Sequence, residues 1–181
     1  WTIASDSELL VQFRVPATKE KAYTSLIRKY QEKLYWHIRR MVVEHEDAND
    51  VLQNVLIRVW NGLENFREDS QLYTWLYRIA TNESLSFLDA QKRKSTTSLT
   101  DVESDLSNKI KADGNFDPNR LEWKLQLAIQ RLPEKQRAVF NLRYYDEMPY
   151  EQMAEISETS VGALKASYHH AVKKIEEILT A

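Results

Sequence analysis

The sequence predicts an all-α protein made of two small helical domains joined by a flexible linker. The 181 residues include only three glycines and four prolines, the residues that most often interrupt helices. Apolar side chains also recur every three or four residues, which is the spacing of one helical face. This periodicity is absent between about residues 95 and 119, so we place the domains at residues 1–94 and 120–181.

Four helices are expected in the first domain. Residues 5–13 begin with an N-capping sequence and form a short helix, and a longer helix follows over residues 19–43. The acidic run at 44–50 opens the third helix, because acids stabilise the positive end of the helix dipole. After a loop, the fourth helix covers residues 72–94, where Trp75 is interpreted as a core residue.

The stripe of the second helix expected to be buried contains Tyr23, Leu26, Ile27, Tyr30, Leu34, Ile38, Met41 and Val42.

The second domain should contain a helix from Arg120 that ends at Pro133, and another that ends at the Met148-Pro149 turn. Residues 150–156 and 161–175 then read as two amphipathic helices joined by a tight turn. This is the layout of a helix-turn-helix whose second helix can enter a major groove of DNA. From the residues alone, an ordinary helical hairpin with a solvated outer face is an equal alternative.

Composition narrows the class of protein. The chain has no cysteine, which excludes disulfides and thiolate metal sites, and it has no apolar run long enough to cross a bilayer. We therefore expect a soluble cytoplasmic protein without membrane insertion, and the start at Trp1 suggests a trimmed N-terminus. The formal net charge of −2 argues against DNA binding by bulk electrostatics, so any DNA contacts must be local or supported by a partner.

Motifs in both domains point to one family. The first domain contains Asp47-Ala-Asn-Asp-Val-Leu-Gln-Asn-Val-Leu-Ile-Arg-Val-Trp60, Phe66-Arg-Glu-Asp-Ser70 and Thr74-Trp-Leu-Tyr-Arg-Ile-Ala-Thr-Asn82. The second contains Leu132-Pro-Glu-Lys-Gln-Arg137, the segment Phe140 to Tyr144 and the helix-turn-helix. Together these segments resemble the extracytoplasmic-function (ECF) sigma factors of bacterial RNA polymerase, which keep only regions two and four of the sigma-70 family. The resemblance covers nearly everything outside the linker.

The resemblance implies that the polar strip of the third helix docks on the clamp helices of the largest polymerase subunit. The alternative is a solvated face, which is usual for a charged helix. The strip contains Asp47, Asp50, Gln53, Asn54 and Arg58.

The resemblance also implies that the loop before the fourth helix, with Asn82 nearby, captures a flipped base of the minus-ten promoter element. Aromatic and basic side chains together suit a separated DNA strand, because rings stack on bases while cations follow phosphates. The predicted minus-ten residues are Arg67, Asp69, Ser70, Arg78, Asn82, Ser86, Lys92 and Arg93.

The last helix would read the minus-thirty-five element. Lysine and histidine side chains on its outer face can contact phosphates or base edges. The predicted residues are Ser160, Val161, Gly162, Ala163, Lys165, Ala166, Ser167, His169, His170 and Lys173.

The chain departs from the family pattern in ways that affect DNA reading. Ser86 stands where many relatives have Asp, and Asp89 stands where they have a basic residue. Ser167 replaces a frequent Arg, and Glu158-Thr159 replaces the usual Gly-Ile of the turn. We therefore expect weak DNA affinity from the second domain alone, with Arg137 and Arg143 either adding DNA-backbone contacts or forming ion pairs with neighbouring acids.

The sequence predicts no enzyme, no metal site and no cofactor. The four histidines lack ligand spacing, and residues 44–50 lack the Gly and closing Glu of a calcium loop. By resemblance, the partners are core RNA polymerase (clamp helices and the beta flap, near Phe140 and Tyr144), promoter DNA and an anti-sigma factor, and the free protein is a monomer. The alternatives are a helix-turn-helix regulator that acts without polymerase, and an anti-sigma or adaptor protein that binds no promoter.

Overall fold

Only helices and their connections occur in the part of the chain that the computed structural model describes, residues 4–94 and 121–181. The N-terminal unit contains α1 (Asp6–Phe13), α2 (Lys19–Val42), α3 (His45–Gly62), the 3-10 turn η1 (Leu63–Asn65) and α4 (Leu72–Lys94). The C-terminal unit contains α6 (Leu121–Gln130), α7 (Glu134–Tyr144), α8 (Tyr150–Ser157) and α9 (Val161–Thr180). The predicted linker over residues 95–119 lies outside the described residues.

The predicted helices are all present, with ends that shift by a few residues. The largest difference is at α9, which continues to Thr180 rather than ending near residue 175. The all-α fold class is confirmed.

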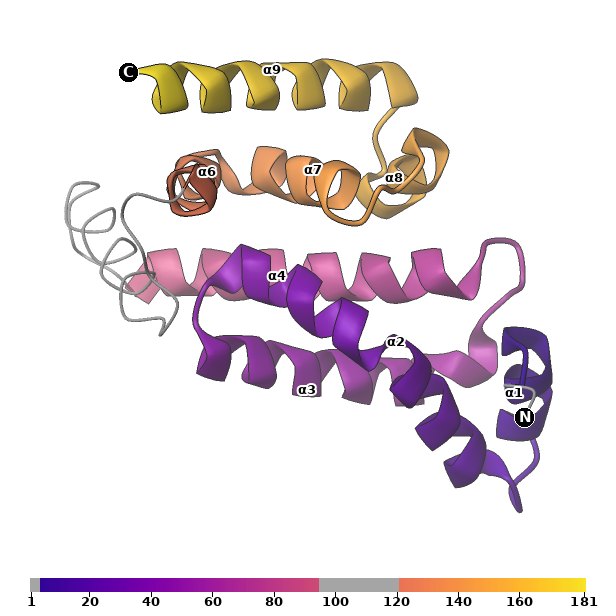
Figure 1. Ribbon diagram of the computed structural model, residues 1–181. Helices are drawn as coiled ribbons and strands as arrows, with labels where there is room; N and C mark the ends of the chain where they lie inside the picture. The colour runs from indigo at the N-terminus through magenta and orange to yellow at the C-terminus, as the bar shows by residue number, and fades with distance from the viewer. Residues whose placement is uncertain (1–3, 95–120) are drawn as a thin grey trace.

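The helices are stacked in layers (Figure 1). α2 and α3 pack against each other and against one side of α4, while α7 and α8 pack against another side of α4. α9 lies outermost and crosses α6, α7 and α8. Helix α4 is therefore the layer shared by the two units.

One apolar core runs through both units. The buried cluster of α1–α4 continues into the C-terminal unit, where its members are Ala138, Val139, Leu142, Met148, Met153, Ile156 and Leu164. A smaller cluster, built around Ile129, Phe140, Ala171 and Ile175, holds α6, α7 and α9 together. The two units are thus docked through apolar burial, an arrangement that the sequence leaves open.

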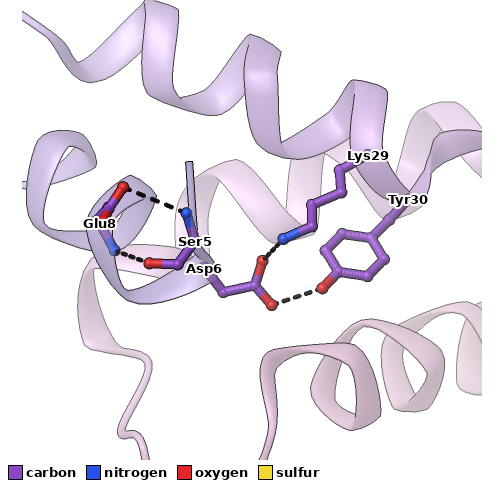
Figure 2. Close-up of polar contacts among 5 residues, drawn as sticks. All are labelled: Ser5, Asp6, Glu8, Lys29 and Tyr30. Atoms are coloured by element: carbon purple, nitrogen blue, oxygen red, sulfur yellow. Dashed lines mark hydrogen bonds and ion pairs between the residues drawn. The ribbon is translucent and has the colours of Figure 1, made fainter. Parts of the chain in front are cut away.

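Polar contacts attach the short helix α1 to α2. Ser5 caps α1 through a capping box with Glu8. The Asp6 carboxylate points from α1 to α2 (Figure 2), where it accepts hydrogen bonds from Lys29 Nζ at 2.7 Å and Tyr30 Oη at 2.5 Å. Burial, followed by the bond to Asp6, raises the pKa of the Tyr30 hydroxyl. This acid therefore joins the two helices at a partly buried position.

Among the described residues, three residues other than glycine adopt positive φ angles at the turns. They are Val43 (φ 77°), Glu147 (φ 48°) and Glu158 (φ 53°). At Val43 the Glu44 N–H donates to the Val42 carbonyl at 3.0 Å, a tight reversal that a β-branched residue adopts only with strain. Left-handed backbone costs a non-glycine residue roughly 1–2 kcal/mol, so contacts elsewhere must hold these turns in place.

Trp75 is half-buried rather than a full core residue. Its ring packs against Phe66 with the ring centroids 5.1 Å apart. A Cβ atom added at Gly62 would lie 3.1 Å from the Trp75 ring, so the end of α3 can approach α4 closely because residue 62 has no side chain.

Within residues 4–94 and 121–181, none of the helices combines the length and apolar character needed to span a bilayer. The same residues contain no group of three acidic or histidine side chains placed to hold a metal ion.

Replacing Asp6 with Ala should lower the free energy of unfolding by about 1–2 kcal/mol, because the Tyr30 hydroxyl loses its acceptor. Urea unfolding followed by circular dichroism measures the change. Ser7→Ala, an exposed position on the same helix, is the control. Equal midpoints for the two variants would contradict the role given to Asp6.

Candidate functional site

The predicted polymerase-docking strip lies along α3. Asp50, Gln53, Asn54 and Arg58 are exposed and Asp47 is half-buried. Arg58 forms an ion pair with Glu83 of α4, so this end of the strip is fixed to the neighbouring helix. The structure therefore places these polar side chains along one face of α3.

An apolar side chain within this strip was missed by the sequence analysis. Ile57 is 59% exposed and lies one turn from Gln53 and Asn54 on α3. Its two neighbours in sequence are not buried either, whereas Val55 and Val59 are. Ile57 lies outside the buried stripe of α3 that includes Val55 and Val59. That position in the helical pattern was the sequence signal from which its exposure could have been predicted.

The predicted minus-ten residues form a track along α4. Arg78, Asn82 and Ser86 are exposed and follow one another at intervals of four residues, which places them on one face. Lys92 and Arg93 continue it at the exposed C-terminal end, where Arg93 pairs with Asp89 at 2.9 Å.

The loop before α4 carries the other three predicted residues. Arg67 and Asp69 are exposed and Ser70 is half-buried. Arg14 supports the loop by donating to the Phe66 carbonyl at 3.2 Å. Asn82 lies roughly 15 Å along α4 from the helix start, at about 1.5 Å per residue, so the loop and Asn82 belong to an extended track rather than to one pocket.

The predicted minus-thirty-five residues extend from the N-cap of α9 to Lys173, over roughly its first two thirds. Ser160 is the N-cap, and its Oγ accepts the Ala163 N–H at 3.1 Å. All ten residues are exposed except Val161 and Ser167, which are half-buried. The Lys165 ammonium lies 5.7 Å from the centre of the Tyr150 ring. The outer face of α9 is therefore exposed to solvent.

Glu158 links the helix-turn-helix to α4. It ends α8 in a left-handed conformation, the position where glycine is usual. Its carboxylate forms an ion pair with Arg78. The residue that departs from the family pattern thus contacts the predicted minus-ten track.

Arg137 is at the centre of a buried polar contact between the units. It donates to the Met41 carbonyl at 3.1 Å and to Gln130 Oε1 at 2.8 Å, while Gln130 donates to the Arg40 carbonyl at 3.0 Å. Burial lowers the pKa of the Arg137 guanidinium to about 10. Two carbonyl groups at the end of α2 therefore accept hydrogen bonds from the C-terminal unit.

The two arginines of α7 have different surroundings. Arg137 is buried against α2 and cannot reach a DNA backbone in this arrangement. Arg143 donates to the Met148 carbonyl at 3.0 Å and stacks over Tyr150 at 4.5 Å. Both therefore contribute to the fold through bonds to backbone carbonyl groups, and a DNA contact by Arg143 stays a prediction.

A second buried polar contact joins α2, α4 and the turn after α7. The Tyr77 hydroxyl donates to Asp146 at 3.1 Å, and His37 Nδ1 lies 3.7 Å from the other Asp146 oxygen. His37 is fully buried, and its Nε2 lies 2.8 Å from Thr81 Oγ1. Burial raises the pKa of Asp146. Burial, followed by the charge of Arg40, lowers the pKa of His37 to about 3.

A groove of about 380 Å³ lies beside the contact between α4 and the C-terminal unit and is lined by residues of both. Asn82 of the predicted minus-ten track lines it, as do Ala163 and Ser167 of the predicted minus-thirty-five set. The structure therefore brings together parts of two sites that the sequence analysis treated as separate.

Comparisons with known proteins match both units to the same protein family. Residues 26–94 match the family model Sigma-70 region 2, and residues 122–175 match Sigma-70, region 4. The RNA polymerase sigma-H factor of Pseudomonas aeruginosa is 32% identical over 176 residues, which cover 92% of this chain and 90% of the relative. The ECF RNA polymerase sigma-E factor of Escherichia coli is 32% identical over 179 residues, covering 93% and 92%.

The chain belongs to the sigma-70 family, in its ECF group.

Two solved structures share the fold of this sigma factor. The sigma factor RpoE in complex with the anti-sigma factor NepR from Bartonella quintana gives a TM-score of 0.67 at 21% identity, covering 89% of this chain and 98% of that one. CnrH in complex with the cytosolic domain of CnrY gives a TM-score of 0.68 at 19% identity, covering 95% of each. The chain is thus an alternative sigma factor, a protein that directs transcription.

The His37→Gln variant should make the stability of this sigma factor less sensitive to acid. The His37 pKa falls from 6.5 when unfolded to about 3 when folded, so between these values the unfolded chain binds a proton that the folded chain excludes. Stability from His37 is present above pH 6.5 and is lost as the pH falls towards 3. Urea unfolding of both proteins at steps between about pH 7 and pH 4 should give a steeper loss for the wild type.

Asp146 changes the pH dependence of stability in the opposite direction to His37. Its pKa is raised in the folded chain, so the folded chain binds a proton at a higher pH than the unfolded chain does. Asp146 is present in both proteins, so the difference between them reports on His37. Identical pH profiles would contradict the burial of a neutral His37.

Proposed function

We propose that this sigma factor binds core RNA polymerase through the polar strip of α3, reads the minus-ten element with α4 and the loop before it, and reads the minus-thirty-five element with α9. The observation that carries the proposal is the exposure of three separate polar surfaces, on α3, α4 and α9, in a chain whose two units match the two family regions. A plain helix-turn-helix regulator has no need of the first two.

Docking on polymerase is proposed for the strip defined above together with Ile57. Charged groups at an interface mainly set orientation and association rate, whereas a central apolar residue contributes through loss of water. Ile57 lies among polar groups on an exposed face, as an anchor surrounded by a polar rim would. The clamp helices of the largest subunit are the proposed partner, and the beta flap is proposed to meet the exposed Tyr144.

Strand opening is proposed for the α4 track. Arg78, Lys92 and Arg93 supply cations for phosphates, and Asn82 supplies an amide that can bond a base edge. The loop residues Arg67, Asp69 and Ser70 would hold an extruded base, which polar groups can recognise by its Watson–Crick edge. This division assigns melting to the N-terminal unit.

Duplex reading is proposed for α9. Its outer face carries the exposed side chains of Lys165, His169 and Lys173, and the N-terminal residues are those with which recognition helices of this motif contact bases. Two weak DNA sites joined by one chain and held on polymerase gain affinity through effective concentration. A chain with a net charge of −2 can therefore act at promoters without a strongly basic surface.

We assign no catalytic step to this chain. Sigma factors are initiation factors, and polymerase performs the reaction.

An anti-sigma factor is a further proposed partner. One similar solved structure is bound to an anti-sigma factor, and a similar inhibitor is proposed here. The partners are those of the bacterial cytoplasm, and the free chain is proposed to be a monomer.

Run-off transcription with bacterial core RNA polymerase on a genomic DNA library tests the proposal. Transcripts that require the protein should appear, and Asp50→Arg should abolish them by reversing a charge in the docking strip. The matched control is Glu32→Arg, an exposed acid on α2, which should retain them. Absence of stimulation, with DNA bound equally well without polymerase, would favour the regulator alternative.

Lys165→Gln should weaken binding of the holoenzyme to a promoter found in that assay. Loss of one phosphate contact should also reduce the slope of log affinity against log salt by about 0.9. Fluorescence anisotropy over a range of salt concentrations measures both effects. Lys21→Gln, at an exposed position of α2, is the control, and an unchanged slope for Lys165→Gln would remove this residue from the DNA contacts.

A further inference from the structure

The loop between η1 and α4 is fixed at both ends. Phe66, its first residue, is buried, and its ring packs against Trp75 with the ring centroids 5.1 Å apart. Gln71, its last residue, accepts the Trp75 N–H at 3.2 Å where α4 begins. Between these ends, Arg67 and Asp69 are exposed. The loop therefore presents side chains to solvent from a backbone whose two ends are attached to the domain.

The first of these ends is also attached to the turn between α1 and α2. Arg14, the C-cap of α1, donates to the Phe66 carbonyl at 3.2 Å across 52 residues of sequence. Lys19, the first residue of α2, pairs with Glu64 of η1 at 2.6 Å. Its ammonium also lies 4.6 Å from the centre of the Trp60 ring. Two cations therefore hold the segment from which the loop starts.

Arg14 extends from a helix that is itself fixed to the domain. The side chains of Leu9, Leu10 and Phe13 are buried on the inner face of α1. The Asp6 carboxylate joins the beginning of the same helix to α2 (Figure 2). Because α1 is attached along its whole length, the guanidinium group of Arg14 is offered to the loop from a fixed position.

The carbonyl group that Arg14 binds controls the direction of the chain after it. This group belongs to the peptide unit that joins Phe66 to Arg67, and a peptide unit is planar and rigid. Fixing its oxygen therefore also fixes the direction in which Arg67 and the residues after it leave Phe66. Recognition of a base requires polar groups held to within about 0.5 Å of the productive geometry. Arg14 can thus affect base recognition without a contact to the base.

We propose that Arg14 is a positioning residue for the minus-ten element and that Lys19 assists it. By holding the Phe66 carbonyl, Arg14 sets the conformation of the loop and so the base preference at the promoter position that the loop reads. This inference rests on the proposed function, because a base preference exists only if the loop reads DNA. Arg14 and Lys19 precede residues 26–94, the segment that matches Sigma-70 region 2, so minus-ten reading depends on residues outside that segment.

The base preference is measured with holoenzyme assembled from core polymerase and this chain. Its probes are fluorescent single-stranded oligonucleotides that carry the minus-ten sequence found by run-off transcription, with each of the four bases at each position. Asp69→Ala identifies the position that the loop reads, because it reduces the preference there. Arg14→Ala should lower the affinity ratio between the best and the second-best base at that position by roughly 3- to 10-fold, as expected for loss of one charged hydrogen bond.

Other variants separate positioning from a general structural role. Arg14→Lys keeps a charged donor and should recover part of the preference, whereas Arg28→Ala, which removes an exposed cation of α2, should retain all of it. In Arg14→Ala, the ratios at the other positions should stay as in the wild type. An equal fall in affinity for all four bases would indicate lost stability or a lost phosphate contact, and would overturn the inference.

Hydrogen exchange in the free protein tests the contact without DNA. The Phe66 N–H donates to the Leu63 carbonyl at 3.2 Å, so its exchange reports on the start of the loop. Arg14→Ala should speed this exchange roughly fivefold, as expected for loss of one hydrogen bond, while peptides from the middle of α2 and α3 keep their protection. Glu64→Gln, which breaks the pair with Lys19, should speed it as well.

Unchanged exchange in both variants would overturn the inference, because Arg14 and Lys19 would then not hold the loop. If Asp69→Ala alters the preference at no position, loop reading in the proposed function fails, and the positioning role fails with it. The exchange measurement distinguishes the two failures, since faster exchange in Arg14→Ala shows that the contact exists even when the loop reads no base.

Discussion

Burial of α4 on more than one side is the constraint on which the rest of the structure depends. α2 and α3 pack on one side of this helix, and α7 and α8 pack on another. Because neighbouring helices cover much of the surface around α4, the residues that remain exposed to a ligand are confined to a narrow strip. That strip carries Arg78, Asn82 and Ser86. The same helix therefore completes the core of both units and provides the face proposed to open DNA.

The interface between the units is specified by polar groups as well as by apolar area. Two apolar surfaces can slide over each other at little cost in free energy. A buried carboxylate or guanidinium group, in contrast, loses its hydration and destabilises the fold unless a hydrogen-bond partner replaces the water. Asp146 needs a donor from α4, which Tyr77 supplies, and Arg137 needs an acceptor from α2, which the Met41 carbonyl supplies. The strained turns lie beside these contacts: Val43 follows the end of α2 that Arg137 binds, Glu147 follows Asp146, and Glu158 pairs with α4. Strain is thus concentrated where the two units meet.

The near-neutral charge of the chain fits the proposed division of work between this sigma factor and polymerase. A chain with a formal net charge of −2 has little bulk attraction for DNA. Under the proposed function, two weak DNA sites joined by one chain and held on one enzyme gain affinity through effective concentration.

The sequence by itself determined the helices, their order, the helix-turn-helix and the family. These features depend on local periodicity, on caps such as Ser160, and on motifs that are contiguous in the chain, so they need no knowledge of distant partners. Only the tertiary structure decided that His37 is buried, that Arg137 faces α2 rather than solvent, and that Glu158 meets Arg78. The partners in these contacts are separated by 44, 96 and 80 residues respectively, and a periodic pattern carries no information about which face of one unit covers another. The docked arrangement follows from long-range complementarity of shape and charge, which local sequence signals do not encode.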